Sequence, residues 1–219
     1  MARKQATSSS DTRENLLRLA ARSFGTYGYS ATTMRNIADA AGIEAASIYY
    51  HFKSKEELVD AVMVDGGKNI IGELHAHLDQ LPAGAGADVR LRAAVIGLMK
   101  AEIKHGDYAL AHARLLAQLP DKVREGQVKR REQHQKWWTS LMEDLRDEGF
   151  LRPDVDIALA RMFILNCVNS VHTWFNPRKG RLEDIGDQLC RIFFEGVKPK
   201  GGREWESNPR KTAGSLNRV

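Results

Sequence analysis

TMRNIADAAGIEAASIYYHF, residues 33–52, is the stretch that decides the fold, because it contains two short helical patterns separated by a glycine. Ile37, Ala38 and Ala41 recur at the spacing of one inward helix face. Gly42 follows them and supplies the backbone conformation that often ends a helix. A second pattern starts at once, so the sequence predicts a pair of helices joined by a tight turn.

The second helix of the pair is expected over residues 44–50 and is poor in large aliphatic residues. Ile43 and Ile48 are the only ones in it or next to it, and the adjacent Tyr49 and Tyr50 cannot both point inward. The outer face therefore carries small, hydroxyl and aromatic groups, namely Ala45, Ala46, Ser47, Tyr49, Tyr50 and His51. A helix-turn-helix places such a helix in the major groove of DNA, with its N-terminal residues at the base edges. The pattern thus indicates a DNA-reading helix.

These residues resemble the DNA-binding domain of the tetracycline-repressor (TetR) family. The likeness covers about residues 11–65 and is carried by TTMRNIADAAG, SIYYHFKSKEEL and the preceding SFGTYGYSA. It implies an all-α fold in which an N-terminal three-helix helix-turn-helix domain binds DNA. A C-terminal helical domain for ligand binding and dimerisation would follow it.

The resemblance also implies which residues touch DNA. Thr33 would contact a phosphate and Arg35 a base edge. The tip of the reading helix would consist of Ala45, Ala46 and Ser47, and the DNA backbone or nearby bases would meet Tyr49, Tyr50, His51 and Lys55. The alternative is that the tyrosines belong to the core.

Physical chemistry supports a phosphate contact at Lys55. Ser54 and Glu57 match a capping box, which places Lys55 at a helix N-terminus, where free backbone amides favour an anion. The alternative is that Ser54 and Glu57 form only a cap. Because alanine cannot make bidentate hydrogen bonds to bases, direct readout falls to Arg35, Ser47 and His51. We therefore expect a specificity that depends on apolar contact and DNA shape.

Composition and charge indicate a globular intracellular protein. The 219 residues are 42% hydrophobic, and Cys167 and Cys190 are too few for a zinc site or a disulfide framework. The polar N-terminus MARKQATSSS and the lack of an apolar run of about 18 residues predict no signal peptide, no membrane partner and a cytoplasmic location. The net charge of +5 is concentrated at the two ends, residues 1–55 and 198–219, which suits a DNA-facing surface at the first of them.

The chain divides into five predicted regions: a disordered N-terminus (1–10), the DNA-binding domain (11–54), a connecting helix (55–81), a ligand-binding and dimerisation domain (82–198) and a disordered basic tail (199–219). Asp11 and Glu14 suggest a capping box for the first helix, whose inward stripe would be Leu16, Ala20, Phe24 and Tyr27. Gly66 and Gly67 suggest a bend in the connecting helix, although two glycines at a tolerant surface position would look the same.

The C-terminal region shows helical patterns over about residues 91–105, 106–119, 121–149, 155–175 and 182–197. The last two are apolar on more than one face, so each must bury one face inside the subunit and another elsewhere. Homodimerisation would achieve this burial. A two-fold dimer would also place two reading helices on successive major-groove turns.

A ligand pocket is expected among these helices, with apolar walls and a few converging polar groups. The candidate residues are Met99, Ile103, Leu116, Trp137, Trp138, Phe163, Asn166, Asn169, Ser170, His172 and Trp174. Each could instead belong to the core or the dimer interface. The segments KWWTSLMEDLRDEGFLRPDVDIALA and NSVHTWFNP resemble TetR-type repressors of steroid and fatty-acid breakdown that respond to CoA thioesters. That likeness implies an acyl-CoA or another hydrophobic metabolite as the effector, with basic groups at the pocket mouth.

The sequence thus predicts a TetR-type transcriptional regulator, in the form of a ligand-released repressor that binds a palindromic operator as a homodimer. A constitutive architectural DNA-binding protein and an activator are the alternatives. An enzyme is not expected, because no phosphate-cradling glycine loop and no nucleophile motif is present. No catalytic residue, metal site or cofactor is therefore predicted.

Overall fold

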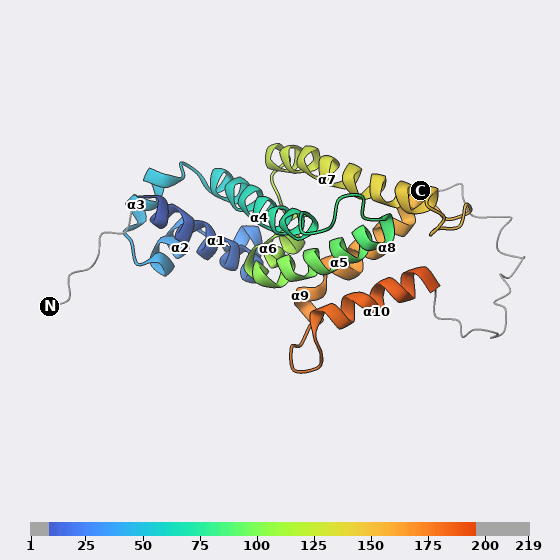
Figure 1. Ribbon diagram of the computed structural model, residues 1–219. Coiled ribbons are helices and arrows are strands. Elements are labelled where there is room, and N and C mark those ends of the chain that lie inside the picture. Colours follow the sequence, from blue (N-terminus) through green and yellow to red (C-terminus); the bar gives the residue numbers. More distant parts are fainter. Residues whose placement is uncertain (1–8, 196–219) are drawn as a thin grey trace, which may run out of the picture.

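The computed structural model of the protein describes residues 9–195, and this part of the chain is all-helical (Figure 1). Its helices are α1 (Ser9–Ala31), α2 (Met34–Ala41), α3 (Ala45–His51), α4 (Lys55–Leu78), α5 (Ala87–Lys104), α6 (Gly106–Leu115), α7 (Asp121–Asp147), α8 (Ile157–Asn169), α9 (Val171–Trp174) and α10 (Leu182–Glu195). The all-α fold predicted from the sequence is confirmed. The predicted tail at 199–219 and most of the predicted N-terminal arm lie outside the described residues.

The molecule is elongated, with α1 to α3 at one end and α5 and α7 to α10 toward the other (Figure 1). Two hydrophobic cores match this division: one is built around α1 to α4, and the other around α5. None of the helices between residues 9 and 195 has the length and apolar character needed to span a membrane.

Helix α1 differs from its prediction at both ends. It includes Ser9, so Asp11 lies within the first turn and does not act as the N-cap. Leu16, Ala20 and Phe24 are buried as predicted, but Tyr27 is 64% exposed, so its place in the inward stripe is wrong. The helical path breaks directly after it, at Gly28 (φ 82°). The left-handed region of Gly28 is one that side chains with a Cβ atom rarely adopt.

The turn between α2 and α3 forms as the sequence predicts. Thr33 is the N-cap of α2, and its hydroxyl accepts a hydrogen bond from the Asn36 N–H at 3.1 Å. Gly42 ends α2 in the left-handed conformation (φ 67°), and the Ile43 N–H donates to the Ala38 carbonyl at 3.1 Å. This bonding pattern closes the helix and sets α3 directly after it.

Helix α4 runs without interruption through Gly66 and Gly67, so the two glycines do not divide it. Gly66 serves a close approach instead, since a Cβ atom at this position would lie 2.8 Å from Cδ1 of Tyr108 on α6. A Cβ atom at Gly67 would meet nothing within 4 Å. Glycine therefore allows α6 to pack closely on α4 at residue 66.

Helix α6 packs on the N-terminal domain together with α4, a contact of α6 that was not predicted from the sequence. Tyr108, Ala111 and Leu115 of α6 are part of the N-terminal core. A Cβ atom at Gly25 of α1 would lie only 3.0 Å from Cγ of Leu110, which shows how closely α1 and α6 approach. A small three-helix bundle gains stability from such added burial.

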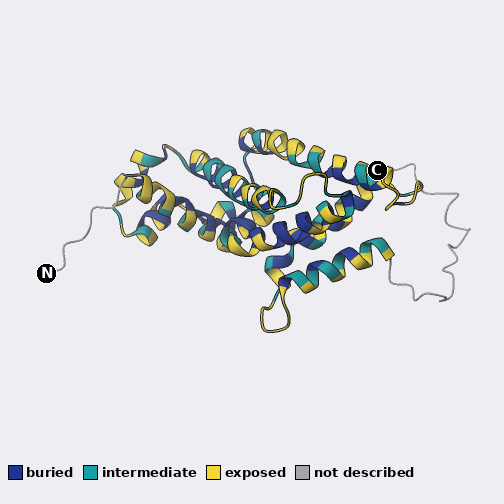
Figure 2. Cartoon of the chain, in the orientation of Figure 1, coloured by how far each residue is buried: buried dark blue, intermediate teal, exposed yellow. Residues whose placement is uncertain are grey.

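Helix α5 is the centre of the C-terminal body and is buried along most of its length (Figure 2). It contacts α4, α7, α8, α9 and α10. The helix predicted over 155–175 is in fact two helices, because Ser170 (φ −90°, ψ −1°) separates α8 from α9. The Ser170 hydroxyl donates to the Cys167 carbonyl at 3.1 Å and accepts from Nε1 of Trp174 at 3.1 Å, and both bonds stabilise this break.

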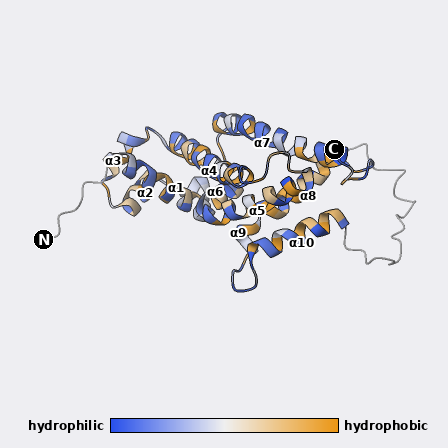
Figure 3. Cartoon of the chain, in the orientation of Figure 1, coloured by the Kyte–Doolittle hydropathy of each residue, from blue (hydrophilic) through white to orange (hydrophobic). Residues whose placement is uncertain are grey.

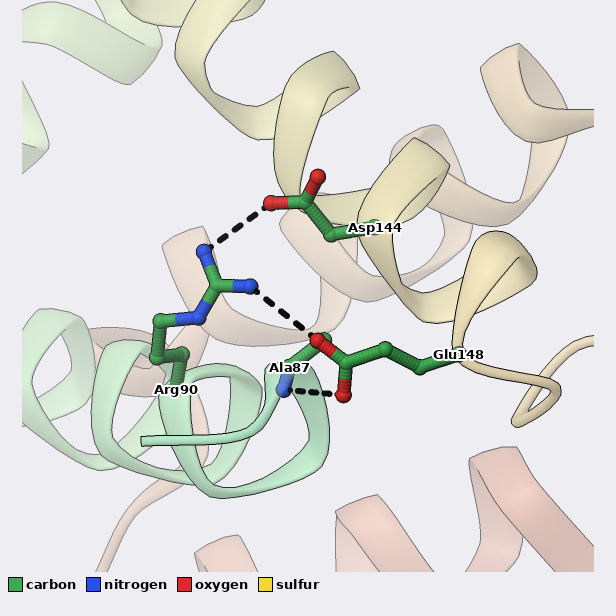
Figure 4. A network of polar contacts seen from close by, with 4 residues as sticks. All are labelled: Ala87, Arg90, Asp144 and Glu148. Atoms are coloured by element: carbon green, nitrogen blue, oxygen red, sulfur yellow. Dashed lines mark hydrogen bonds and ion pairs between the residues drawn. The ribbon is translucent and has the colours of Figure 1, made fainter. Parts of the chain in front are cut away.

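A polar network fixes the C-terminal end of α7 to the start of α5 (Figure 4). The Ala87 N–H donates to Oε2 of Glu148 at 2.8 Å, so a carboxylate from a distant segment caps α5, whose own N-cap residue, Gly86, has no side chain to do so. Arg90 pairs with Asp144 at 2.9 Å and with Glu148 at 3.6 Å. The acidic group at the helix N-terminus is also favoured by the helix dipole.

Candidate nucleic-acid interface and ligand site

The α3 helix is exposed, as the sequence analysis expected (Figure 2). Of its residues only Ile48 is buried, and it anchors the helix in the N-terminal core. Tyr49 is 53% exposed and Tyr50 is 84% exposed, so neither is a core residue. The predicted tip residues Ala45, Ala46 and Ser47 are also exposed. A surface of small, hydroxyl and aromatic groups thus projects from the end of the molecule.

The start of α2 lies in the same helix pair and is also open to solvent. Met34, Ile37 and Ala38 hold α2 on the core, while Thr33 and Arg35 are exposed. Thr33 is engaged in capping α2 through its hydroxyl. Because Arg35 is exposed, its guanidinium group can reach DNA beside α3.

The N-terminus of α4 forms one half of the capping box predicted for Ser54 and Glu57: Ser54 caps the helix, while the Glu57 carboxylate accepts from the N–H of the preceding Lys53 in place of that of Ser54. The Glu57 N–H donates to Oγ of Ser54 at 3.1 Å, and the Glu57 carboxylate accepts from the Lys53 N–H at 2.8 Å. Lys55 lies with its ammonium 4.1 Å from the centre of the Tyr29 ring. His51, at the end of α3, is half-buried and packs edge-on against Tyr50.

Two further basic residues lie near this surface, and of these Lys53 was not among the predicted DNA-facing residues. Lys53 is exposed between α3 and α4, and its position just before a capping box could have identified it. Arg13 of α1 stands 5.0 Å from the centre of the Phe52 ring, in a cation–π arrangement. Both add positive charge to the end of the molecule that carries α3.

The candidate ligand residues do not meet in one cavity. Met99 and Trp138 are fully buried in the C-terminal core, where Nε1 of Trp138 donates to Nε2 of His134 at 3.0 Å. Trp137 is half-buried and packs edge-on against His75 of α4. Leu116 packs against the N-terminal core instead.

The other candidates from α8 and α9 lie mainly at the surface. Phe163, Asn166 and Ser170 line an open hollow of about 360 Å³ on α8 together with Leu159, Met162 and Cys167. The Asn166 side chain donates to the carbonyl of Met162 at 2.8 Å, within its own helix. Three further candidates are exposed, namely Ile103, Asn169 and Trp174. Surface exposure favours an interface over an enclosed pocket for this group.

His172 is the predicted ligand residue with the most unusual surroundings. Its side chain is 9% exposed, and its Nδ1 lies 3.6 Å from Oε2 of Glu102 on α5. Neither ring nitrogen makes a hydrogen bond of ordinary geometry to a described residue. Burial lowers the pKa of His172 and raises the pKa of Glu102 to about 7, so burial favours the neutral form of each. Glu102 lies in the helical pattern over residues 91–105 but was not among the residues predicted for the ligand site.

The chain matches two sequence profiles. Residues 16–62 match the profile of bacterial regulatory proteins of the tetR family, and residues 84–197 match the tetracyclin repressor-like C-terminal domain. The chain belongs to the TetR family. Its exposed α3 is therefore the second helix of a TetR-family helix-turn-helix, and the protein is a DNA-binding transcriptional regulator.

Curated relatives of this TetR-family protein share nearly its whole length. It is 31% identical over 193 residues to the HTH-type transcriptional repressor KstR2 of Mycobacterium tuberculosis, a match that covers 86% of this chain and 94% of that protein. It is 34% identical over 197 residues to KstR2 of Mycolicibacterium smegmatis, covering 87% and 92%. Both relatives are repressors by name.

Solved structures show the same TetR-family architecture. The structure of the ketosteroid transcriptional regulator KstR2 of Mycobacterium tuberculosis aligns with a TM-score of 0.71 at 29% identity and covers 88% of this chain and 98% of that one. AibR, solved in complex with isovaleryl coenzyme A and operator DNA, aligns with a TM-score of 0.73 at 24% identity and covers 84% and 98%. The second likeness is one of fold alone.

Proposed function

We propose that this TetR-family regulator is a ligand-released repressor that binds a palindromic operator as a homodimer. The observation that carries the proposal is the exposure of α3, in which Ile48 alone of 7 residues is buried. Two copies related by a two-fold axis would present two such helices to major-groove segments about 34–36 Å apart.

The DNA contacts divide by chemistry. Arg35 and Ser47 can donate hydrogen bonds to base edges, while the methyl groups of Ala45 and Ala46 can pack on thymine methyl groups. Thr33, Tyr49, Tyr50, His51 and Lys55 are assigned to phosphates and adjacent bases. Because few of these groups can read a base by hydrogen bonding, DNA shape supplies part of the specificity.

The dimer interface is assigned to the α8 apolar face, which we define as Leu159, Met162 and Phe163. Helix α8 carries much hydrophobic colour in Figure 3. All three are exposed, and Phe163 is 60% exposed. Met162 and Phe163 follow Leu159 by three and four residues, which places both beside Leu159 on one stripe of the helix. A contiguous exposed apolar surface of this kind suits contact with a second copy of the chain.

The effector is assigned to the acyl-CoA esters. The likeness of the C-terminal region to repressors of steroid and fatty-acid breakdown supports this class. The KstR2 structure is named as that of a ketosteroid regulator, and AibR, which shares the fold, was solved with isovaleryl coenzyme A. Glu102, three residues after Met99 on α5, and His172 are buried polar groups beside the C-terminal core, and we assign to them the contact with a polar atom of the acyl group.

The test is a gel-shift titration with overlapping fragments that cover the DNA upstream of the gene. We expect one fragment with an inverted repeat to be retarded by two copies of the chain. Acyl-CoA esters of increasing chain length should release it, whereas free coenzyme A should not. A protein that retards no fragment would refute the DNA-binding assignment. Retardation that no acyl-CoA ester reverses would refute the effector class and leave the operator assignment intact.

A further inference from the structure

Tyr29 contacts both the first turn of α4, which carries Lys55, and the segment that follows α6. It lies directly after the break at Gly28, and its ring is half-buried and stacked near Phe24, with 6.2 Å between ring centres. The ammonium of Lys55 stands 4.1 Å from the centre of the Tyr29 ring, and the Tyr29 hydroxyl donates to Oε1 of Glu56 at 2.9 Å. One side chain thus contacts two consecutive residues in the first turn of α4.

The backbone of Tyr29 is held by the segment that follows α6. The Tyr29 N–H donates to Oε1 of Gln118 at 2.9 Å. A Cβ atom at Gly28 would lie 2.7 Å from the same oxygen, so glycine is what lets the Gln118 side chain approach. Arg114 of α6 donates to the Thr26 carbonyl at 2.8 Å and reinforces the contact. The end of α1 is therefore fixed by two side chains from the C-terminal half of the chain.

We infer that Tyr29 is a positioning residue for DNA binding, which acts by holding the Lys55 ammonium beside the N-terminus of α4. The inference rests on the proposed function, because it requires Lys55 to contact a phosphate. A lysine side chain loses rotamer freedom when it is fixed against a phosphate. Holding it over an aromatic ring beforehand removes part of that cost, because the cation is attracted to the ring face. Gln118 contributes by fixing the backbone that carries the ring.

The inference is tested by a double-mutant cycle on operator affinity, measured by fluorescence anisotropy with a fragment that the wild-type chain retards. We expect Tyr29→Leu to weaken binding about fivefold and to lower the salt slope, because Lys55 no longer stands ready for its phosphate. Tyr29→Phe keeps the ring and should bind within about twofold of wild type. In a Lys55→Met background, Tyr29→Leu should have no further effect. Gln118→Leu should weaken binding in the wild-type background and change nothing further in the Lys55→Met background.

Matched controls separate this role from a general effect on folding. Tyr27→Leu removes a nearby tyrosine that is 64% exposed, and Lys68→Met removes an exposed lysine from the middle of α4. Neither should change operator affinity. NMR gives a reading on the unmodified protein: the Lys55 side-chain methylene protons should resonate upfield because of the Tyr29 ring current. Absence of that shift would overturn the inference even if Tyr29→Leu fails to fold.

The remaining outcomes are distinguishable. An equal loss from Tyr29→Leu in the wild-type and Lys55→Met backgrounds would mean that Tyr29 supports the domain without acting through Lys55, and the inference would be wrong. If Lys55→Met itself left the affinity and salt slope unchanged, the phosphate role of Lys55 and this inference would fail while operator binding stood. A wild-type chain that retards no fragment would instead remove the proposed function.

Discussion

Glu102 offers the sharpest energetic prediction, because an acid buried in the C-terminal body must make stability depend on pH. Glu102 is 7% exposed, and burial raises the pKa of its carboxyl group from 4.5 to about 7. The folded state therefore binds this proton more tightly than the unfolded state. The stabilising contribution is complete below pH 4.5 and is lost as the pH rises to about 7.

The magnitude follows from the same values. Each pKa unit corresponds to about 1.36 kcal/mol, so the full contribution is about 3 kcal/mol, of which about 2 kcal/mol is lost between pH 5 and pH 8. Glu102→Gln replaces the carboxyl with a neutral group of similar shape. We expect the variant to match wild type at pH 5 and to be about 2 kcal/mol more stable at pH 8.

The assay is urea unfolding of both chains at pH 5, 6.5 and 8, followed by tryptophan fluorescence. His172 also titrates: burial lowers its pKa, so its contribution is present above pH 6.5 and is lost as the pH falls. His172 lies 3.6 Å from Glu102, so the substitution also changes the surroundings of the imidazole. The comparison at pH 8, above the ordinary pKa of histidine, therefore reports on Glu102 most directly. Glu143→Gln on the exposed face of α7 is the control and should follow wild type at every pH. Parallel pH profiles for wild type and Glu102→Gln would refute the reasoning.

Three further substitutions test the packing, the cap and the interface. Gly66→Ala should lower stability by about 1–3 kcal/mol, because its Cβ atom would lie 2.8 Å from Tyr108. Gly67→Ala has open space around it and should be neutral or slightly stabilising. Thermal melts of the two variants test this, and equal effects would contradict the close approach of α6 to α4. Glu148→Ala removes the cap of α5 and should cost about 1 kcal/mol, seen as a melting temperature lower by about 2–4 °C, while Asp147→Ala should cause a smaller change. Phe163→Glu places a charge on the α8 apolar face and should shift the protein from dimer to monomer in analytical ultracentrifugation; a variant that stays dimeric would move the interface elsewhere.

The helix pair could be predicted because its signals are local. Gly42 can end a helix wherever the chain goes next, and the lack of aliphatic residues in α3 left Ile48 as its one anchor, which the structure confirms. The all-α fold followed from helical periodicity for the same reason. These features need no knowledge of distant contacts.

Features that depend on distant contacts were not predicted. The pair Gly66 and Gly67 suggested a bend, but glycine is needed at residue 66 because the Tyr108 ring, far along the chain, packs against it. The packing of α6 on α1 likewise joins two regions that the sequence analysis assigned to different domains. Apolar residues on α8 indicate burial without saying what covers them. The structure therefore divides the candidate ligand residues among the C-terminal core, the hollow on α8 and the N-terminal core. It leaves Ile103, Asn169 and Trp174 exposed outside the hollow, and His172 beside Glu102.

The central claim is that the exposed face of α3 lies against a DNA duplex, and one gel-shift comparison tests it most directly. Ala46 is exposed at the start of α3, so Ala46→Glu should fold normally while placing a negative charge where the duplex would lie. We predict that the wild-type chain retards a fragment of its own upstream DNA and that Ala46→Glu, with an unchanged melting temperature, does not. Equal retardation by both chains would contradict the account.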